Sequence, residues 1–307
     1  MGLNRSATAA GTDDRKQHSP VSEPNALPDS FVHMAAASEF DTDTAVRRAS
    51  GTPGTGRWLA DLTNRWDIND KPNGGYVLAT AVRAMAGAVP DHPHPFTVTA
   101  HYLRPSQSGP VEIDVEVVRT GRKLATVSAS FVQAGKERIR LLGTFGDLTE
   151  AKGPTVVRAT PPELPPIGSC VRRQHDEGPL HPMSNIADRT ETFLDPTTGW
   201  VNGTPNGVAV VKAWTRFADG RAPDVWSLPF YVDAMPPAVF EVLDGAQWVP
   251  TIELTVHIRA VPAPGWLRTV MSTRFLMDGY LEEDGEIWDS TGTLVAQSRQ
   301  FGMIFRP

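Results

Sequence analysis

The sequence predicts an α+β protein made of two similar halves, each with one buried helix packed on an antiparallel sheet. Three observations support this prediction. Two stretches are apolar on almost every side, which is typical of helices enclosed by other structure. The segments after each stretch alternate apolar and polar residues, as half-buried strands do. The order of strand, helix and several strands also occurs twice, about 150 residues apart, which is too long for a solenoid repeat and indicates a duplicated domain.

The first half begins with a strand-like segment at residues 57–68, "RWLADLTNRWDI". A helix is expected at 76–88, directly after an Asn-Gly-Gly sequence, and Pro90 ends it because proline cannot continue a helix. Alternating apolar residues then predict three strand-rich segments, with a turn at Gly121 inside the second. These segments are "PFTVTAHYLRP", "GPVEIDVEVVRTGRKLATVSASFVQAG" and "ERIRLLGTFG".

The second half repeats this order. "GVAVVKAWTRF" predicts a strand at 207–217, and "YVDAMPPAVFEVLDG" predicts a short helix at 231–245 with a glycine at its end. Strand-rich segments follow to the end of the chain. The repeat is visible in the residues themselves, because "ELTVHIRAVPAPG" at 253–265 resembles "TVTAHYLRPSQSG" at 97–109.

Four parts of the chain follow from these patterns. Residues 1–35 are small, polar and proline-containing, and we expect a disordered tail there. The two halves then occupy 36–150 and 169–307, and the proline-rich segment 151–168 links them. A sheet wrapped around one buried helix is the hot-dog arrangement. We expect two hot-dogs joined edge to edge into one continuous sheet, because this pairing covers an exposed edge strand on each half.

Composition excludes several classes of protein. The 307 residues are 40% hydrophobic, enough for a substantial core, and the net charge of −6 without a basic run argues against nucleic acid as a partner. No apolar run reaches the ~20 residues of a membrane span. Cys170 is the single cysteine, which rules out an intramolecular disulfide and favours a reducing, cytoplasmic location. The histidines His92 and His94 lie in a turn without companion ligands, so neither a metal nor a cofactor is expected.

The starts of the two helices are the candidate functional positions. Asn73, Gly74 and Gly75 begin the first, where bare backbone N–H groups could hydrogen-bond the oxyanion of an acyl-transfer reaction. Helix capping by Asn73 and close packing of the glycines explain the same residues without a function. Asp233 lies at or near the start of the second helix, where the helix dipole would keep it ionised, although an ordinary capping role is equally consistent.

The pattern "NGGY…TAHYLRP…TFG" followed by "VDAMPP…WVPTIELTVHIRA…DGYLEEDGEIWDSTGTLVAQSRQ" resembles the double hot-dog acyl-CoA thioesterases. The resemblance extends over about residues 40–305. It implies that an Asp, a hydroxyl residue and a Gln hold the water that attacks the thioester. By position these are Asp233, Thr251 and Gln300 rather than Gln297. Thr255 is the alternative hydroxyl, since residues two apart on a strand share a face.

The same resemblance implies acyl-CoA as the substrate and hydrolysis to free acid and CoA as the reaction. Asn73, Gly74, Gly75 and Tyr76 are then expected to bind the substrate, and Arg104 to contact the phosphates of CoA. A non-catalytic acyl-CoA-binding or regulatory protein on the same fold is the alternative, because fold does not fix function. A hydratase would need an Asp–His pair at the helix entry, which the sequence lacks there. Homo-oligomers are also possible, since exposed sheet edges can pair.

Overall fold

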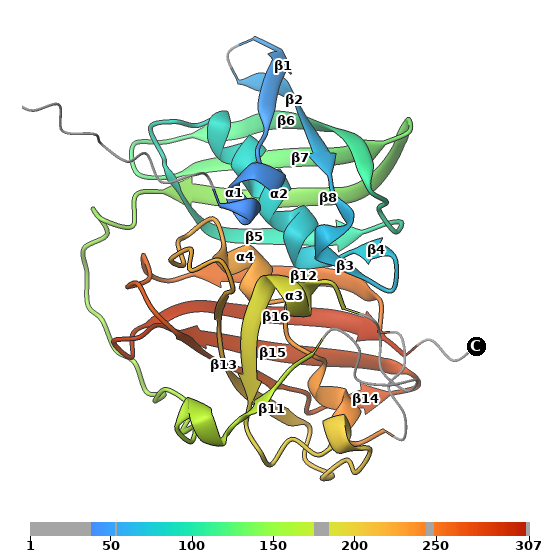
Figure 1. The fold of residues 1–307 in the computed structure, drawn as a ribbon. Coiled ribbons are helices and arrows are strands. Elements are labelled where there is room, and N and C mark those ends of the chain that lie inside the picture. Colours follow the sequence, from blue (N-terminus) through green and yellow to red (C-terminus); the bar gives the residue numbers. More distant parts are fainter. Residues whose placement is uncertain (1–37, 53, 175–183, 244–248, 305–307) are drawn as a thin grey trace, which may run out of the picture. The chain divides into compact units, whose positions relative to one another are not determined.

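A computed structural model describes residues 38–52, 54–174, 184–243 and 249–304 of the chain. The predicted disordered tail, residues 1–35, lies outside these ranges. The described residues form a 14-stranded antiparallel sheet, whose strands from both halves follow one another in Figure 1. From the first half come, in spatial order, β1 (Arg47–Ser50), β2 (Thr55–Leu62), β6 (Gly109–Thr120), β7 (Ala125–Gln133), β8 (Lys136–Gly146) and β5 (His94–Tyr102).

The second half continues the same sheet. Its strands follow β5 in the order β12 (Thr251–Ile258), β16 (Leu294–Met303), β15 (Tyr280–Trp288), β13 (Leu267–Ser272), β11 (Val210–Phe217), β10 (Thr190–Leu194) and β9 (Val171–Arg172). The short strand β14 (Leu276–Met277) pairs with β15, and β3 (Asp67–Ile68) pairs with β4 (Lys71–Pro72) outside the large sheet. The strands expected from alternation are therefore present, while β9 and β10 had no clear sequence signal.

The two halves meet through the strands that resemble each other in sequence. Strand β5 pairs with β12, and Thr99 lies opposite Thr255, its counterpart in the repeat, with 2.8 Å between their hydroxyl oxygens. On either side of this pair, Val98 lies opposite Val256 and Ala100 lies opposite Leu254. Because the antiparallel pairing is centred on one pair of equivalent residues, the junction has the local twofold symmetry expected of a duplicated domain.

Helix α2 (Gly74–Gly87) is the buried helix of the first half (Figure 1). It starts two residues earlier than predicted and ends at Gly87, one residue earlier than predicted, with Ala88 as its C-cap and Pro90 following two residues later. Residues on all its sides, including Val77, Leu78 and Ala81, are buried, and it packs against β2, β5, β6 and β7. The apolar sequence is thus explained by the sheet that covers it.

The helix predicted at 231–245 is wrong in position and length. The structure has α4 (Leu228–Tyr231), which packs against α2, and then a single 3₁₀ turn, η4 (Ala238–Glu241). Pro236 and Pro237 explain the interruption, because proline lacks the N–H donor and disfavours a helical conformation in the residue before it. Asp233 therefore follows a helix and does not cap one.

The remaining short elements connect the halves. Residues 151–166, most of the proline-rich segment, contain no helix or strand, and they are followed by η2 (Ile167–Ser169). Helix α1 (Glu39–Asp43) brings Phe40 against Trp66 of η1 (Asn64–Trp66) and against Phe217 and Phe230 of the second half, with ring centroids 4.9–5.5 Å apart. Short elements α3 (Ile186–Arg189) and η3 (Trp200–Asn202) complete the second half. No helix in the described ranges is long and apolar enough to cross a membrane.

Candidate active site

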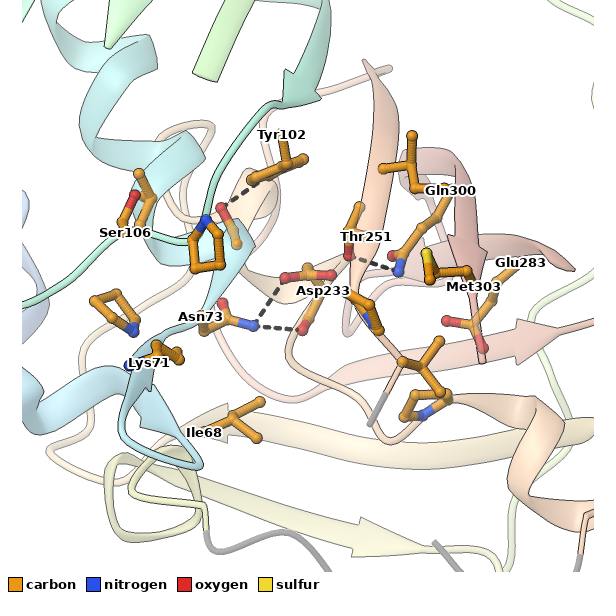
Figure 2. A pocket seen from close by; sticks show the side chains of 18 of the residues that line it. Ile68, Lys71, Asn73, Tyr102, Ser106, Asp233, Thr251, Glu283, Gln300 and Met303 are labelled. Atoms are coloured by element: carbon orange, nitrogen blue, oxygen red, sulfur yellow. Dashed lines mark hydrogen bonds between the residues drawn. The ribbon is translucent and has the colours of Figure 1, made fainter. Parts of the chain in front are cut away.

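A cavity of about 330 Å³ lies where the start of α2, the chain after α4 and the ends of β12 and β16 meet (Figure 2). Both halves contribute to its walls. Three of the predicted residues, Asp233, Thr251 and Gln300, line it together. Its apolar wall is formed mainly by Ile68, Val77, Ile139, Trp200, Met235, Phe240, Val249 and Met303, together with five prolines.

The carboxyl group of Asp233 is fixed against the start of α2. Its Oδ2 accepts hydrogen bonds from the backbone N–H of Gly75 at 2.7 Å and from Nδ2 of Asn73 at 2.8 Å. The same Asn73 Nδ2 donates to the Asp233 carbonyl at 2.9 Å, and Asn73 Oδ1 accepts from the Tyr76 N–H at 2.9 Å. Asn73 is thus an N-cap, as the sequence allowed, and it also anchors an acid from the other half of the chain.

Close packing explains Gly75. A Cβ atom there would lie 2.8 Å from Asp233 Cβ and 2.8 Å from the Pro229 carbonyl oxygen. Of the two glycines, only Gly74 lines the cavity, and a Cβ on it would lie 3.1 Å from Asp233 Oδ2. The Gly75 N–H already binds Asp233, which gives this residue a structural role, and its contact with the substrate stays a prediction.

Tyr76 was also predicted to bind the substrate, and the structure places it elsewhere. Its side chain is fully buried in the core, stacked on Trp66 with 5.7 Å between ring centroids. Its hydroxyl donates to the Asp43 carbonyl at 2.9 Å and accepts from the Thr63 N–H at 3.2 Å. Tyr76 points away from the cavity because successive residues of a helix are rotated around its axis, so it lies on a different side of α2 from Gly74.

Thr251 and Gln300 form a direct pair on neighbouring strands. Gln300 Nε2 donates to Thr251 Oγ1 at 2.8 Å (Figure 2). A β-bulge lies between Thr251 and Glu253, so the rule of alternate residues fails across it. Thr255, expected on the same face as Thr251, lines a different groove instead.

That groove lies on the other face of the sheet. It also contains Gln297, which supports the choice of Gln300 over Gln297, and Thr255 there bonds Glu253 Oε1 at 2.6 Å. The bulge thus leaves Thr251 as the hydroxyl in the Asp233 cavity.

The electrostatics of Asp233 differ from the prediction. Burial raises the pKa of its carboxyl to about 6, although the hydrogen bonds from Gly75 and Asn73 oppose the rise. No helix dipole points at it from its own segment, since α4 ends just before it. Asp233 therefore titrates close to neutrality, which suits a general base better than a permanently ionised capping residue would.

Tyr102 is linked to the Asp233 carboxyl by hydrogen bonds through the peptide unit between Gly74 and Gly75. Its hydroxyl donates to the Gly74 carbonyl oxygen at 2.9 Å, and the N–H of that same peptide unit, which belongs to Gly75, donates to Asp233. Chained hydrogen bonds of this kind polarise one another. No sequence pattern predicts this role, because it depends on where β5 passes the start of α2.

Glu283 is a second carboxyl in the cavity wall that the sequence analysis missed. It is 7% exposed, and its Oε2 accepts from the Ala238 N–H at 2.5 Å. Burial is the main cause that raises its pKa to about 8, and the nearby charge of Asp233 adds to it. A signal was present, since alternation along β15 places Glu283 between the buried Leu281 and Ile287.

Cationic side chains also reach the cavity. Lys71 and Arg104 line it from the first half, and Arg104 Nη1 donates to the Glu137 carbonyl at 2.9 Å on the exposed rim. Arg173, buried in the second half, donates from Nη1 to the Ala234 carbonyl at 2.7 Å, next to Asp233. Within the described ranges, no group of three His, Cys, Asp or Glu side chains is arranged to hold a metal ion.

Comparisons with known proteins agree with this architecture. A family model described as the acyl-CoA thioesterase N-terminal domain matches residues 62–146, and one described as the acyl-CoA thioesterase C-terminal domain matches residues 161–304. A protein of Mycobacterium tuberculosis whose function is uncharacterised is 27% identical over 286 residues, covering 86% of this chain and 98% of that protein.

Two solved structures extend the comparison. A candidate thioesterase II of Thermobifida fusca is 30% identical, with a TM-score of 0.75, and covers 87% of this chain and 98% of its own. A protein of Alicyclobacillus acidocaldarius, described as having a hot-dog fold and an unknown function, has a TM-score of 0.76 at 21% identity, with 89% and 100% coverage. At that identity the likeness shows the fold alone, and it confirms the predicted hot-dog class.

Proposed function

Because the chain belongs to the acyl-CoA thioesterase family, we propose that it hydrolyses acyl-CoA to a free acid and CoA, with Asp233 as the general base. The observation that carries the proposal is the shared cavity of Asp233, Thr251 and Gln300. A carboxyl with a pKa of about 6 has the basicity needed near neutral pH. The hydroxyl of Thr251 and the amide of Gln300 do not titrate in this range, and they orient the water.

The reaction proceeds from a water held by these three groups. Its oxygen attacks the thioester carbonyl carbon while Asp233 takes one of its protons, which gives a tetrahedral intermediate with a negative oxygen. Gln300 donates to the Thr251 oxygen, so the Thr251 hydroxyl hydrogen is available to the water. The carbon–sulfur bond then breaks, and the proton on Asp233 returns to the departing sulfur of CoA.

The start of α2 supplies the donor for the negative oxygen. The first N–H groups of a helix have no partner within the helix. Here the N–H of Asn73 binds the Trp66 carbonyl at 3.0 Å, that of Gly75 binds Asp233, and that of Tyr76 binds Asn73 Oδ1. Gly74 is the remaining residue of this turn and lies at the cavity wall. We assign its N–H the oxyanion role that the sequence analysis gave to both glycines.

The test is release of free thiol from short, medium and long acyl-CoAs, followed with a thiol reagent. We expect turnover by the wild-type protein, and we expect Asp233→Asn to lower kcat by ~10²–10⁴-fold, the usual contribution of a general base. Asp289→Asn is the control, since Asp289 is also a carboxyl that accepts backbone N–H groups but lies outside the cavity. Acyl-CoA binding without thiol release would instead establish the non-catalytic alternative, and full activity of Asp233→Asn would refute the assignment of the base.

A further inference from the structure

Glu283 lies one strand away from the proposed water site. It is directly opposite Gln300 in the pairing of β15 with β16, so the two side chains leave the same face of the sheet about 4.5–5.5 Å apart at their Cβ atoms. Figure 2 shows Gln300, Met303 and Glu283 next to one another among the side chains that line the cavity. The acid is therefore inside the same cavity and beyond Gln300 as seen from the junction of the halves.

The surroundings of Glu283 leave much of its hydrogen-bonding capacity unused. In the described part of the chain its one hydrogen bond joins Oε2 to the Ala238 N–H. With a pKa raised to about 8 by burial, the carboxyl is protonated at neutral pH and carries an O–H donor. Because Glu283 is part of the cavity wall, a ligand atom that accepts a hydrogen bond can pair with this donor.

The reaction itself makes no use of this donor. Asp233 serves as base, Thr251 and Gln300 hold the water, and the backbone at Gly74 faces the oxyanion. The wall around Glu283 is otherwise apolar and includes Met235, Phe240 and Met303. In binding cavities of this kind, a few placed polar groups determine which ligand is accepted.

We propose that Glu283 forms a recognition subsite for acyl groups that carry a hydroxyl or carbonyl oxygen a few carbons from the thioester. The inference rests on the proposed thioesterase function and adds a substrate class to it. Neighbouring strands are about 4.8 Å apart. An acyl chain that passes Gln300 thus comes within reach of Glu283 after a few carbons. Lys71 and Arg104 line the cavity from the other half, where the CoA portion would lie.

The experiment compares hydroxyacyl-CoAs with unsubstituted acyl-CoAs of the same length, with the hydroxyl placed in turn on carbons 3, 4 and 5. We expect the wild-type kcat/KM to favour at least one hydroxylated substrate by about tenfold or more, the value of one hydrogen bond to a buried group. Glu283→Gln keeps a donor and should retain most of this preference. Glu283→Met should bring the ratio of the two kcat/KM values to about one. Glu286 lies three residues further along the same strand and lines the groove on the other face of the sheet. Its substitution Glu286→Gln should leave the ratio unchanged.

Distinct results separate this inference from the function on which it rests. Absence of thiol release from every acyl-CoA would refute the proposed function. In that case calorimetry can still compare how tightly the wild-type protein binds hydroxylated and plain acyl-CoA, and equal affinities would refute the subsite as well. Turnover without any preference in the wild-type protein would refute the subsite alone. A Glu283→Met protein that loses activity equally on both substrates would also refute it, because Glu283 would then serve the reaction or the fold.

Discussion

Removing the charge of Asp233 should stabilise the folded protein while it abolishes the proposed reaction. The pKa of Asp233 rises from its usual 3.8 to about 6 because of burial. An acid with a raised pKa favours folding below its usual pKa, and this contribution is lost as the pH rises through about 6. Each pKa unit corresponds to about 1.4 kcal/mol, so ionisation of Asp233 at pH 8 should cost the folded state about 2–3 kcal/mol. Asp233→Asn cannot ionise and avoids this cost.

The assay is urea unfolding of both proteins between pH 4 and pH 8. We expect the free energy of unfolding of Asp233→Asn, relative to the wild type, to increase by about 2–3 kcal/mol across this range, with most of the increase between pH 4 and pH 6. Asp289→Asn gives the opposite control. Although burial opposes it, hydrogen bonds from Ala263, Thr291 and Thr293 lower the pKa of Asp289. Its amide variant should therefore be less stable than the wild type by a nearly constant amount from pH 4 to pH 8, because the titration of Asp289 lies below its usual pKa of 3.8. A difference between Asp233→Asn and wild type that does not change with pH would refute the reasoning.

Three further predictions concern the same region. Gly75→Ala should reduce the free energy of unfolding, measured by urea titration, by about 1–3 kcal/mol, because its Cβ would lie 2.8 Å from Asp233 Cβ. Gly153→Ala is the control, because a Cβ there meets open space. Equal stability of the two variants would contradict the close packing at Gly75. The kcat/KM for acyl-CoA should rise with pH and level off above about 6, as Asp233 loses its proton; a flat profile from pH 5 to pH 8 would exclude it as the base. Tyr102→Phe removes the donor to the Gly74 carbonyl and should move the midpoint of that pH profile upward by up to about one pH unit. If the substitution changes thermal stability but leaves the midpoint where it is, Tyr102 serves only the fold.

Periodicity was sufficient for the sheet and for α2, because both are governed by which face is buried. The helix expected at 231–245 failed for a local reason. Its composition is apolar, but Pro236 and Pro237 remove backbone donors in its second turn, and the chain forms two short pieces instead. A closer weighting of these prolines would have placed Asp233 after a helix.

The site residues show a similar division. The resemblance to the family identified Asp233, Thr251 and Gln300, and the structure brings all three to one cavity. The roles of Thr255 and Tyr76 could not be judged from spacing, because a bulge reverses the strand face and a helical turn redirects the side chain. Glu283 could have been found, since an acid on the inward face of a strand is unusual.

The pairing of β5 with β12 has a consequence for how the proposed activity could be controlled. Asp233 belongs to one half of the chain, and the two groups that orient it, Asn73 and the Gly75 N–H, belong to the other. A small shift of one half relative to the other along the β5–β12 pairing would break the hydrogen bonds from Asn73 and Gly75 to Asp233 without unfolding either half. The relative position of the two halves is thus a condition for the proposed chemistry, and both the β5–β12 pairing and the packing of α4 on α2 maintain it.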